Sequence, residues 1–161
     1  MNTNFVITDA VKDDVPVLYA MIRELAEFEH LAAALQVTTE SLGDALFGDK
    51  PAAAALIGRL DGAIVGYAVW YRTFSTFVGR PGVFLEDLYV RPEYRNRGFG
   101  RELLETALRV GGGDDPGRYE WITLRWNESA LNFYRKLGAR LLNEWVGVRM
   151  SGKPLEKLMG R

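Results

Sequence analysis

The stretch VFLEDLYVRPEYRNRGFGRELL, residues 83–104, decides the predicted fold. Its apolar run ends at Val90, Arg91-Pro92 turns the chain, and a segment with helical apolar spacing runs from Gly98 to Val110. The first turn of a helix presents unpaired N–H groups and a partial positive charge, and glycine lets an anion approach the backbone closely. Arginines beside these glycines add charge and hydrogen-bond donors. The stretch therefore predicts a strand, a glycine–arginine loop and a helix that bind a polyanion such as a pyrophosphate.

The spacing of these glycines excludes two widespread phosphate loops. The pattern G-x-x-x-x-G-K-[ST] is absent, and G-x-G-x-x-G fails because Leu103 stands at its last glycine. What remains is R-x-x-G-x-G from Arg95 to Gly100, directly after a strand that carries Glu86 and Asp87. A second interpretation stays open, in which this is a solvated basic helix start and the glycines serve only a tight turn.

Strands and helices alternate along the whole chain. Short apolar runs predict strands, whereas apolar residues at i, i+3 and i+4 next to capping residues predict helices. An Asp61-Gly62 hairpin, a turn at 80–82 and a loop at 111–117 are also expected. The order predicts a mixed α/β sheet with helices on both faces, and no linker is long enough to divide residues 1–161 into two domains. The predicted strands are 5–8, 52–60, 63–72, 83–90, 119–125, 141–142 and 145–150, and the predicted helices are 13–28, 38–48, 98–110 and 128–137.

The composition excludes several kinds of chemistry. The 161 residues contain no cysteine and one histidine, His30, so disulfides, thiol nucleophiles and cysteine or histidine metal clusters are not expected. A sequence pI near 5.9 argues against a nucleic-acid partner. No apolar run reaches the ~18 residues of a membrane span, and the N-terminus has no signal-peptide pattern. We expect a cytoplasmic protein with no metal and no membrane or nucleic-acid partner.

The charges are unevenly distributed along the chain. Residues 1–50 carry three basic and nine acidic side chains, whereas the remainder carries 17 basic and 12 acidic ones. This asymmetry favours a cationic ligand for the first part and an anionic ligand for the second, although solvated surfaces would explain it equally well.

The loop at 95–100 resembles the R/Q-x-x-G-x-G/A pyrophosphate loop of the GCN5-related N-acetyltransferases, the GNAT superfamily. The stretch 126–139, WNESALNFYRKLGA, resembles the C-terminal motif of that family, and segments 22–29, 84–90 and 127–139 are most similar to the diamine (spermidine/spermine-type) acetyltransferases. The resemblance implies a largely antiparallel mixed sheet with a splayed central strand. It also implies acetyl-CoA as cosubstrate and a homodimer.

The resemblance assigns cofactor contacts to three segments. The backbone of Leu88, Tyr89 and Val90 would pair with the pantetheine arm, although the same residues are also expected in the sheet core. Asn127 and Ser129 would add a further contact, and Asn127 has an equal alternative as the N-cap of the last helix. The pyrophosphate contacts would be Arg95, Asn96, Arg97, Gly98, Phe99, Gly100 and Arg101.

Two residues match catalytic positions of the family. Tyr134 matches the general acid that protonates the leaving thiolate, because a phenol titrates near ~10 and a thiol near ~8.5. Glu86 matches the base that removes a proton from the amine, directly or through water. Neighbouring strand residues point to opposite faces unless a bulge intervenes, so Asp87 is the weaker candidate, for holding the amine. The alternatives are a Tyr134 ring packed beside Phe133 and a Glu86 carboxylate that is solvated or paired with arginine.

The amine site of the family draws on the end of the first helix. Phe28 and Glu29 fall there, and Glu144 is a further candidate, although Phe28 also continues an apolar stripe and Glu29 fits plain surface. Residues 73–77 carry no acid, which favours a shorter cation than a long polyamine. The expected reaction is direct attack of a diamine, polyamine or lysine-like amine on acetyl-CoA in a ternary complex. Acetylation of protein N-termini or lysines, and a non-catalytic CoA-binding sensor, are the alternatives.

Overall fold

The computed structural model describes residues 4–160, which form two compact units. The sheet unit ends at Ile122 and the C-terminal unit begins at Thr123. The expectation of one domain over residues 1–161 stays a prediction, and each unit is described by itself. None of the helices between residues 4 and 160 is long and apolar enough to cross a membrane.

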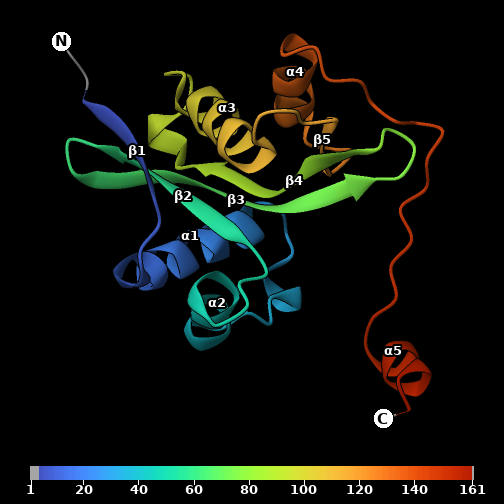
Figure 1. The fold of residues 1–161 in the computed structure, drawn as a ribbon. Coiled ribbons are helices and arrows are strands. Elements are labelled where there is room, and N and C mark those ends of the chain that lie inside the picture. Colours follow the sequence, from blue (N-terminus) through green and yellow to red (C-terminus); the bar gives the residue numbers. More distant parts are fainter. Residues whose placement is uncertain (1–3, 161) are drawn as a thin grey trace. The chain divides into compact units, whose positions relative to one another are not determined.

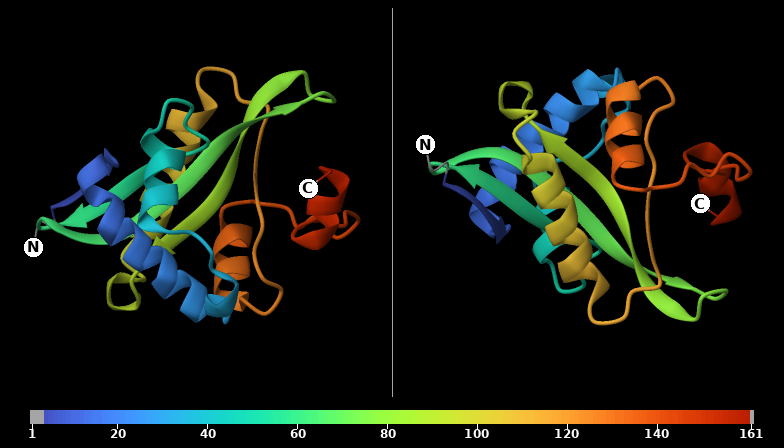
Figure 2. Two further views of the ribbon diagram at one scale, coloured as in Figure 1. Left: turned by 90° about the horizontal axis from the view of Figure 1, so that it is seen from below. Right: turned by 90° about the horizontal axis from the view of Figure 1, so that it is seen from above.

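The sheet unit is a five-stranded mixed sheet with the strand order β1-β2-β3-β4-β5. Neighbours from β1 to β4 are antiparallel, and β5 runs parallel to β4. Helices α1 and α2 cover one face and α3 covers the other (Figures 1 and 2). The α/β class with a largely antiparallel sheet and helices on both faces is thus confirmed. The elements are β1 Phe5–Asp9, α1 Val15–Phe28, α2 Thr39–Phe47, β2 Ala54–Leu60, β3 Ala63–Ser75, β4 Arg80–Val90, α3 Phe99–Gly112 and β5 Arg118–Trp121.

Each face of the sheet buries its own apolar layer. Leu18 and Met21 of α1 pack with Ile57 and Tyr67 of the sheet, and all four side chains have no exposed surface. On the other face Leu103 of α3 is equally buried. Apolar residues at helical spacing therefore face the sheet on both sides, as the periodicity predicts.

The two hairpins of the sheet differ in how well the sequence predicts them. Asp61 and Gly62 both have positive φ, and Leu60 pairs with Ala63, which confirms the two-residue turn. The turn predicted at 80–82 is wrong, because β4 already begins at Arg80. The chain reverses at residues 76–79 instead, where Gly79 has φ 71° and its N–H donates to the Ser75 carbonyl at 2.7 Å.

Helix α3 continues past its predicted end at residue 110, because its last turn packs closely on the sheet. The loop expected at 111–117 begins only at Gly113, because α3 includes Gly111 and Gly112. A Cβ at Gly111 would lie 2.7 Å from the Trp70 ring, and one at Gly112 would lie 2.7 Å from the Tyr119 hydroxyl. Glycine lets this last turn lie directly on the sheet. The predicted strand 119–125 is likewise shorter than expected and ends at Trp121.

The C-terminal unit contains two helices and no strand among its described residues, 123–160. Helix α4 spans Glu128–Lys136 and is followed by Gly138 at φ 86°, as predicted. The strands predicted at 141–142 and 145–150 are wrong, since that segment has no regular structure and is almost entirely exposed. An apolar run becomes a strand only where another strand pairs with it. A short helix that the sequence analysis missed, α5, spans Lys153–Leu158.

Replacement of Gly111 by alanine should destabilise the sheet unit, because the added methyl group overlaps Trp70 at 2.7 Å and Val83 at 2.9 Å. Overpacking of this kind costs about 1–3 kcal/mol, so the denaturant midpoint should fall. Gly43→Ala in α2 is the matched control, because nothing lies within 4 Å of its Cβ position. Alanine should raise stability there by roughly 0.5–1 kcal/mol. Equal midpoints for both variants would contradict this packing at the end of α3.

Candidate active site

The glycine–arginine loop has two residues with positive φ directly before a helix start. Asn96 and Gly98 have φ 60° and 90°, and α3 begins immediately afterwards, at Phe99. The first backbone bonds of the helix run from the Arg101 and Glu102 N–H groups to the Gly98 carbonyl, at 3.0 and 3.1 Å. The N–H groups of Phe99 and Gly100 precede these bonds and are the helix donors that a phosphate accepts from.

The three arginines of the loop have different surroundings. The Arg95 guanidinium lies over two aromatic rings, 5.1 Å from the Phe28 centroid and 5.6 Å from that of Tyr89, and its Nε donates to the Val90 carbonyl at 2.8 Å. Arg97 lies 4.9 Å above the Phe99 ring. Arg101 forms an exposed pair with Glu105 at 2.7 Å. Arg95 therefore ties the loop to β4 and to the end of α1, whereas the other two arginines remain at the surface.

A second anchor joins α1 to the end of β4. The Glu24 carboxylate accepts hydrogen bonds from Arg91 Nε at 3.1 Å, from Arg91 Nη2 at 2.9 Å and from the Tyr89 hydroxyl at 3.2 Å. A bidentate arginine–carboxylate pair fixes orientation as well as distance. No local sequence pattern predicts this pair, because its members are 67 positions apart in the chain.

Strand β4 carries a bulge at the predicted base. Val69 of β3 pairs with Asp87 and Trp70 pairs with Leu85, which leaves Glu86 without a register partner. A bulge inserts one residue into a strand and redirects the side chains around it. The side chains of Glu86 and Asp87 therefore need not point to opposite faces, as neighbours in a regular strand do.

The outer edge of β4 opens just beyond this bulge. The parallel strand β5 pairs only with Gly82–Leu85. On that edge, none of the residues described, 4–160, forms a strand beside Glu86–Val90. Tyr89 and Val90 are buried in the sheet, as the core interpretation predicts, and Leu88 is half-buried. The open segment thus coincides with the predicted pantetheine contacts Leu88, Tyr89 and Val90.

Asp87 is the most perturbed carboxyl group of the sheet unit. Burial raises its pKa to about 6, the charge of Glu86 adds to the rise, the hydrogen bond from Tyr67 lowers it, and Glu29 raises it slightly. The Tyr67 hydroxyl lies 3.2 Å from Asp87 Oδ2. Burial also raises the pKa of Glu29. Three predicted residues, Glu29, Glu86 and Asp87, are therefore close enough for their charges to interact.

For the predicted site residues of the C-terminal unit, the structure shows contacts within that unit alone. The Asn127 side-chain oxygen accepts from the Ala130 N–H at 3.1 Å, which confirms the N-cap. Tyr134 is 9% exposed, and its ring lies 5.2 Å from that of Phe133, as the packing alternative predicts. Ser129 is exposed, and Glu144 is exposed and pairs with Arg140 at 3.7 Å. The cofactor and catalytic roles of these residues stay predictions.

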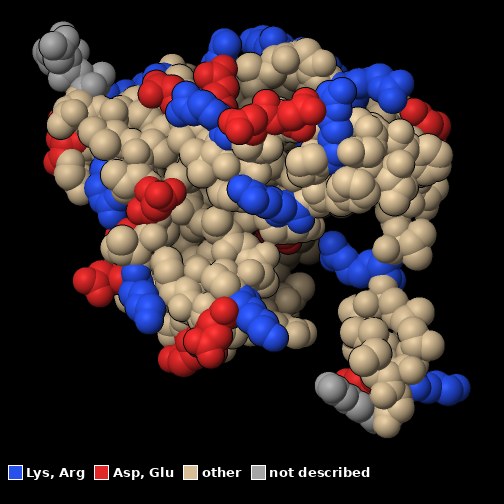
Figure 3. Space-filling view, viewed as in Figure 1, with Lys and Arg blue, Asp and Glu red and all other residues tan. Residues whose placement is uncertain are grey.

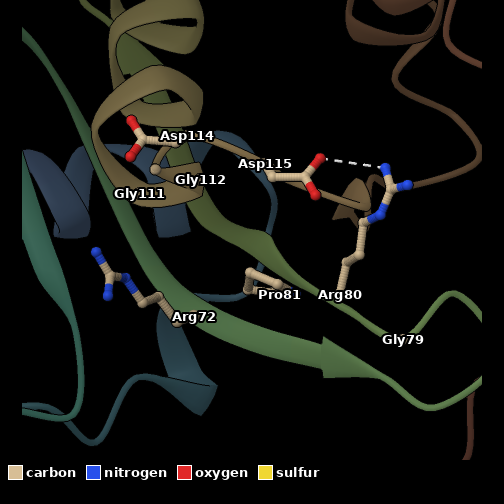
Figure 4. Close-up of a pocket in the computed structure, with 9 residues that line it drawn as sticks. Arg72, Gly79, Arg80, Pro81, Gly111, Gly112, Asp114 and Asp115 are labelled. Carbon is tan, nitrogen blue, oxygen red and sulfur yellow. Dashed lines mark hydrogen bonds and ion pairs between the residues drawn. The ribbon is translucent and has the colours of Figure 1, made fainter.

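A hollow elsewhere in the sheet unit contains none of the predicted site residues. It has a volume of about 340 Å³ and lies where α3 ends beside the β3–β4 hairpin (Figure 4). Arg80 and Asp115 form a 3.2 Å ion pair at its rim.

On the face shown in Figure 3, acidic and basic side chains are interspersed. The asymmetry along the sequence therefore does not produce separate acidic and basic surfaces on that face.

Comparisons with known proteins agree with this geometry. Residues 18–139 match the Acetyltransferase (GNAT) family. The thialysine N-epsilon-acetyltransferase of Mus musculus is 34% identical, with 96% of this chain and 97% of the relative covered. A human spermidine/spermine N(1)-acetyltransferase-like protein 1 is 29% identical over 89% of this chain and 21% of its own length. A Vibrio cholerae integron cassette protein has the same fold, with a TM-score of 0.79, 20% identity and 98% of both chains covered.

The loop before α3, the open edge of β4 and these matches lead to one conclusion. The chain belongs to the GNAT family of acetyltransferases and is similar to thialysine and spermidine/spermine-type members of it.

Proposed function

We propose that the protein transfers an acetyl group from acetyl-CoA to a primary amine of a small cationic substrate: a diamine, a polyamine or a lysine-like amino acid. The observation that carries the substrate class is the interacting set of carboxyl groups Glu29, Glu86 and Asp87. The repulsion that Glu86 and Glu29 exert on Asp87 is relieved when an ammonium group binds beside it. The names of the relatives, which refer to thialysine and to spermidine and spermine, support the same class.

Acetyl-CoA is the cosubstrate of the family, and the sheet unit has donors suited to it. In the proposed complex the N–H groups of Phe99 and Gly100, together with Arg97, bind the pyrophosphate. The open edge of β4 suits an amide-bearing arm, because backbone donors and acceptors on a strand edge pair readily with the amide groups of a ligand. Asn96, Gly98 and Arg101 complete the loop, Arg95 holds it in place, and Asn127 and Ser129 are proposed as further contacts.

We propose direct attack of the amine on the thioester. Glu86 is exposed and accepts the ammonium proton, directly or through water, while Asp87 and Glu29 hold the cation beside Phe28. The amine nitrogen then forms a bond to the acetyl carbon as the carbon–sulfur bond breaks. Tyr134 donates its proton to the departing thiolate, and the second proton, which the nitrogen loses as the amide forms, restores the phenol. Glu144 is a further candidate for the amine site.

We also propose that the protein is a homodimer that works in the cytoplasm. Support for the dimer comes from the C-terminal unit, where Trp145, Val146 and Val148 are 70%, 84% and 93% exposed. Large apolar side chains exposed in a row are typical of protein–protein contacts. A monomer in sedimentation equilibrium at micromolar concentration would contradict the dimer.

The purified protein should release free CoA from acetyl-CoA when a short cationic amine is present. We expect a higher kcat/KM for lysine-like amino acids and short diamines than for spermine, because residues 73–77 supply no acid for a distant ammonium group. A lysine with an already acetylated side chain serves as the control, because its side-chain amine is blocked. Turnover with a peptide N-terminus alone would favour the protein-acetylating alternative. Tight CoA binding without turnover of any amine would favour the sensor.

Tyr134→Phe and Glu86→Gln should each lower kcat by about 10²-fold or more, since general acid–base groups contribute about 10²–10⁴-fold. Both variants should keep their affinity for CoA, measured by calorimetry. Asp44→Asn, an exposed acid-to-amide change on α2, is the control and should leave kcat unchanged. Unaltered turnover in Tyr134→Phe would exclude its phenol as the acid.

A further inference from the structure

Tyr67 is a polar side chain in the centre of the sheet that the proposed reaction does not use. It lies on β3, opposite Tyr89 of β4, and its side chain has no exposed surface. Its ring packs in the apolar layer between the sheet and α1. A phenylalanine would fill the same space, so the hydroxyl group requires its own explanation.

The hydroxyl group of Tyr67 bonds to the substrate-side acid. It lies 3.2 Å from Asp87 Oδ2, and Asp87 is two residues from Tyr89 on the neighbouring strand. A buried hydroxyl group without a partner costs free energy, so this bond fixes the tyrosine as well as the carboxylate. Burial and the charge of Asp87 raise the pKa of Tyr67 well above its usual value. The phenol therefore stays protonated and remains a donor throughout the neutral range.

The other groups around Asp87 oppose its ionisation. Glu86 on the same strand and Glu29 after α1 both add negative charge, and burial acts in the same direction. Tyr89 lies beside Tyr67, with ring centroids 6.1 Å apart, and its hydroxyl donates to Glu24 rather than to Asp87. Of the influences on the pKa of Asp87, the bond from Tyr67 is the one that favours the charged form.

We propose that Tyr67 is a positioning residue, which holds Asp87 ionised and oriented to bind the ammonium group of the amine substrate. The inference rests on the proposed function, because it concerns how the amine is held. Tyr67 would then affect amine binding from the core of the sheet, through Asp87 and without touching the amine.

This arrangement fixes the direction of the pH dependence. Asp87 binds a cation only as a carboxylate, so KM for the amine should rise as the pH falls through its pKa of about 6. Loss of the Tyr67 hydroxyl removes an interaction that lowers this pKa. The acidic limb of the pH profile of kcat/KM for the amine should then move to higher pH. The pH dependence of KM for acetyl-CoA should stay unchanged.

The test compares Tyr67→Phe with the unaltered protein in two measurements. In the pH profile of kcat/KM for the amine, we expect the acidic midpoint to move upward by roughly 0.5–1 pH units, from the free energy of one hydrogen bond. NMR titration of the Asp87 carboxyl carbon should show the same upward movement without any substrate. Tyr19→Phe, which removes a hydroxyl from a half-buried residue against the same core, is the control and should change neither.

Each outcome bears on one of the two proposals. An Asp87 titration that is the same in Tyr67→Phe and in the unaltered protein overturns the inference, whatever the activity. A moved titration together with an unmoved kcat/KM profile overturns the claim that Asp87 holds the amine. Absence of turnover with every amine contradicts the proposed function, while the NMR titration still decides whether Tyr67 controls the ionisation of Asp87.

Discussion

The open edge of β4 is the constraint on which the rest of the sheet unit depends. Among the described residues, 4–160, β4 has a strand partner on one side along nearly its whole length, but on the other side only from Gly82 to Leu85. Backbone donors and acceptors need partners, so a strand that stays open must be held from elsewhere. The open part is held at its end, where Arg91 reaches Glu24 of α1 and Arg95 bonds to the Val90 carbonyl. An edge that is fixed at its end and has no neighbouring strand among the described residues is suited to an extended amide-bearing ligand.

Two acids of the sheet unit, Glu24 and Asp87, have contrasting electrostatic surroundings. Glu24 is neutralised by a bidentate arginine and is a structural group. Asp87 is bonded to a phenol, lies among other acids and has a raised pKa. A carboxylate kept near like charges costs stability, and perturbed groups of this kind cluster at functional sites. This contrast separates the acids that build the fold from those proposed to bind the amine.

The sequence predicts the features that local chemistry determines. Asp61-Gly62 specifies its turn by itself, and the R-x-x-G-x-G loop specifies the start of α3. The features it missed depend on distant partners. The bulge at Glu86 follows from the register of β4 against β3, and the Glu24–Arg91 and Tyr67–Asp87 contacts join separate elements. Two errors have the same origin: 141–150 has the composition of strands without a strand partner, and Arg80-Pro81 has the composition of a turn but pairs with β3.

We propose that the loop before α3 and the open edge of β4 bind one CoA molecule together. The most direct test follows backbone amide NMR signals of the protein during a titration with CoA. We expect the largest changes at residues 98–101 and 88–90, saturating at the same CoA concentration. Binding of CoA that leaves those amide signals unchanged, or that changes only the loop signals, would exclude a shared site.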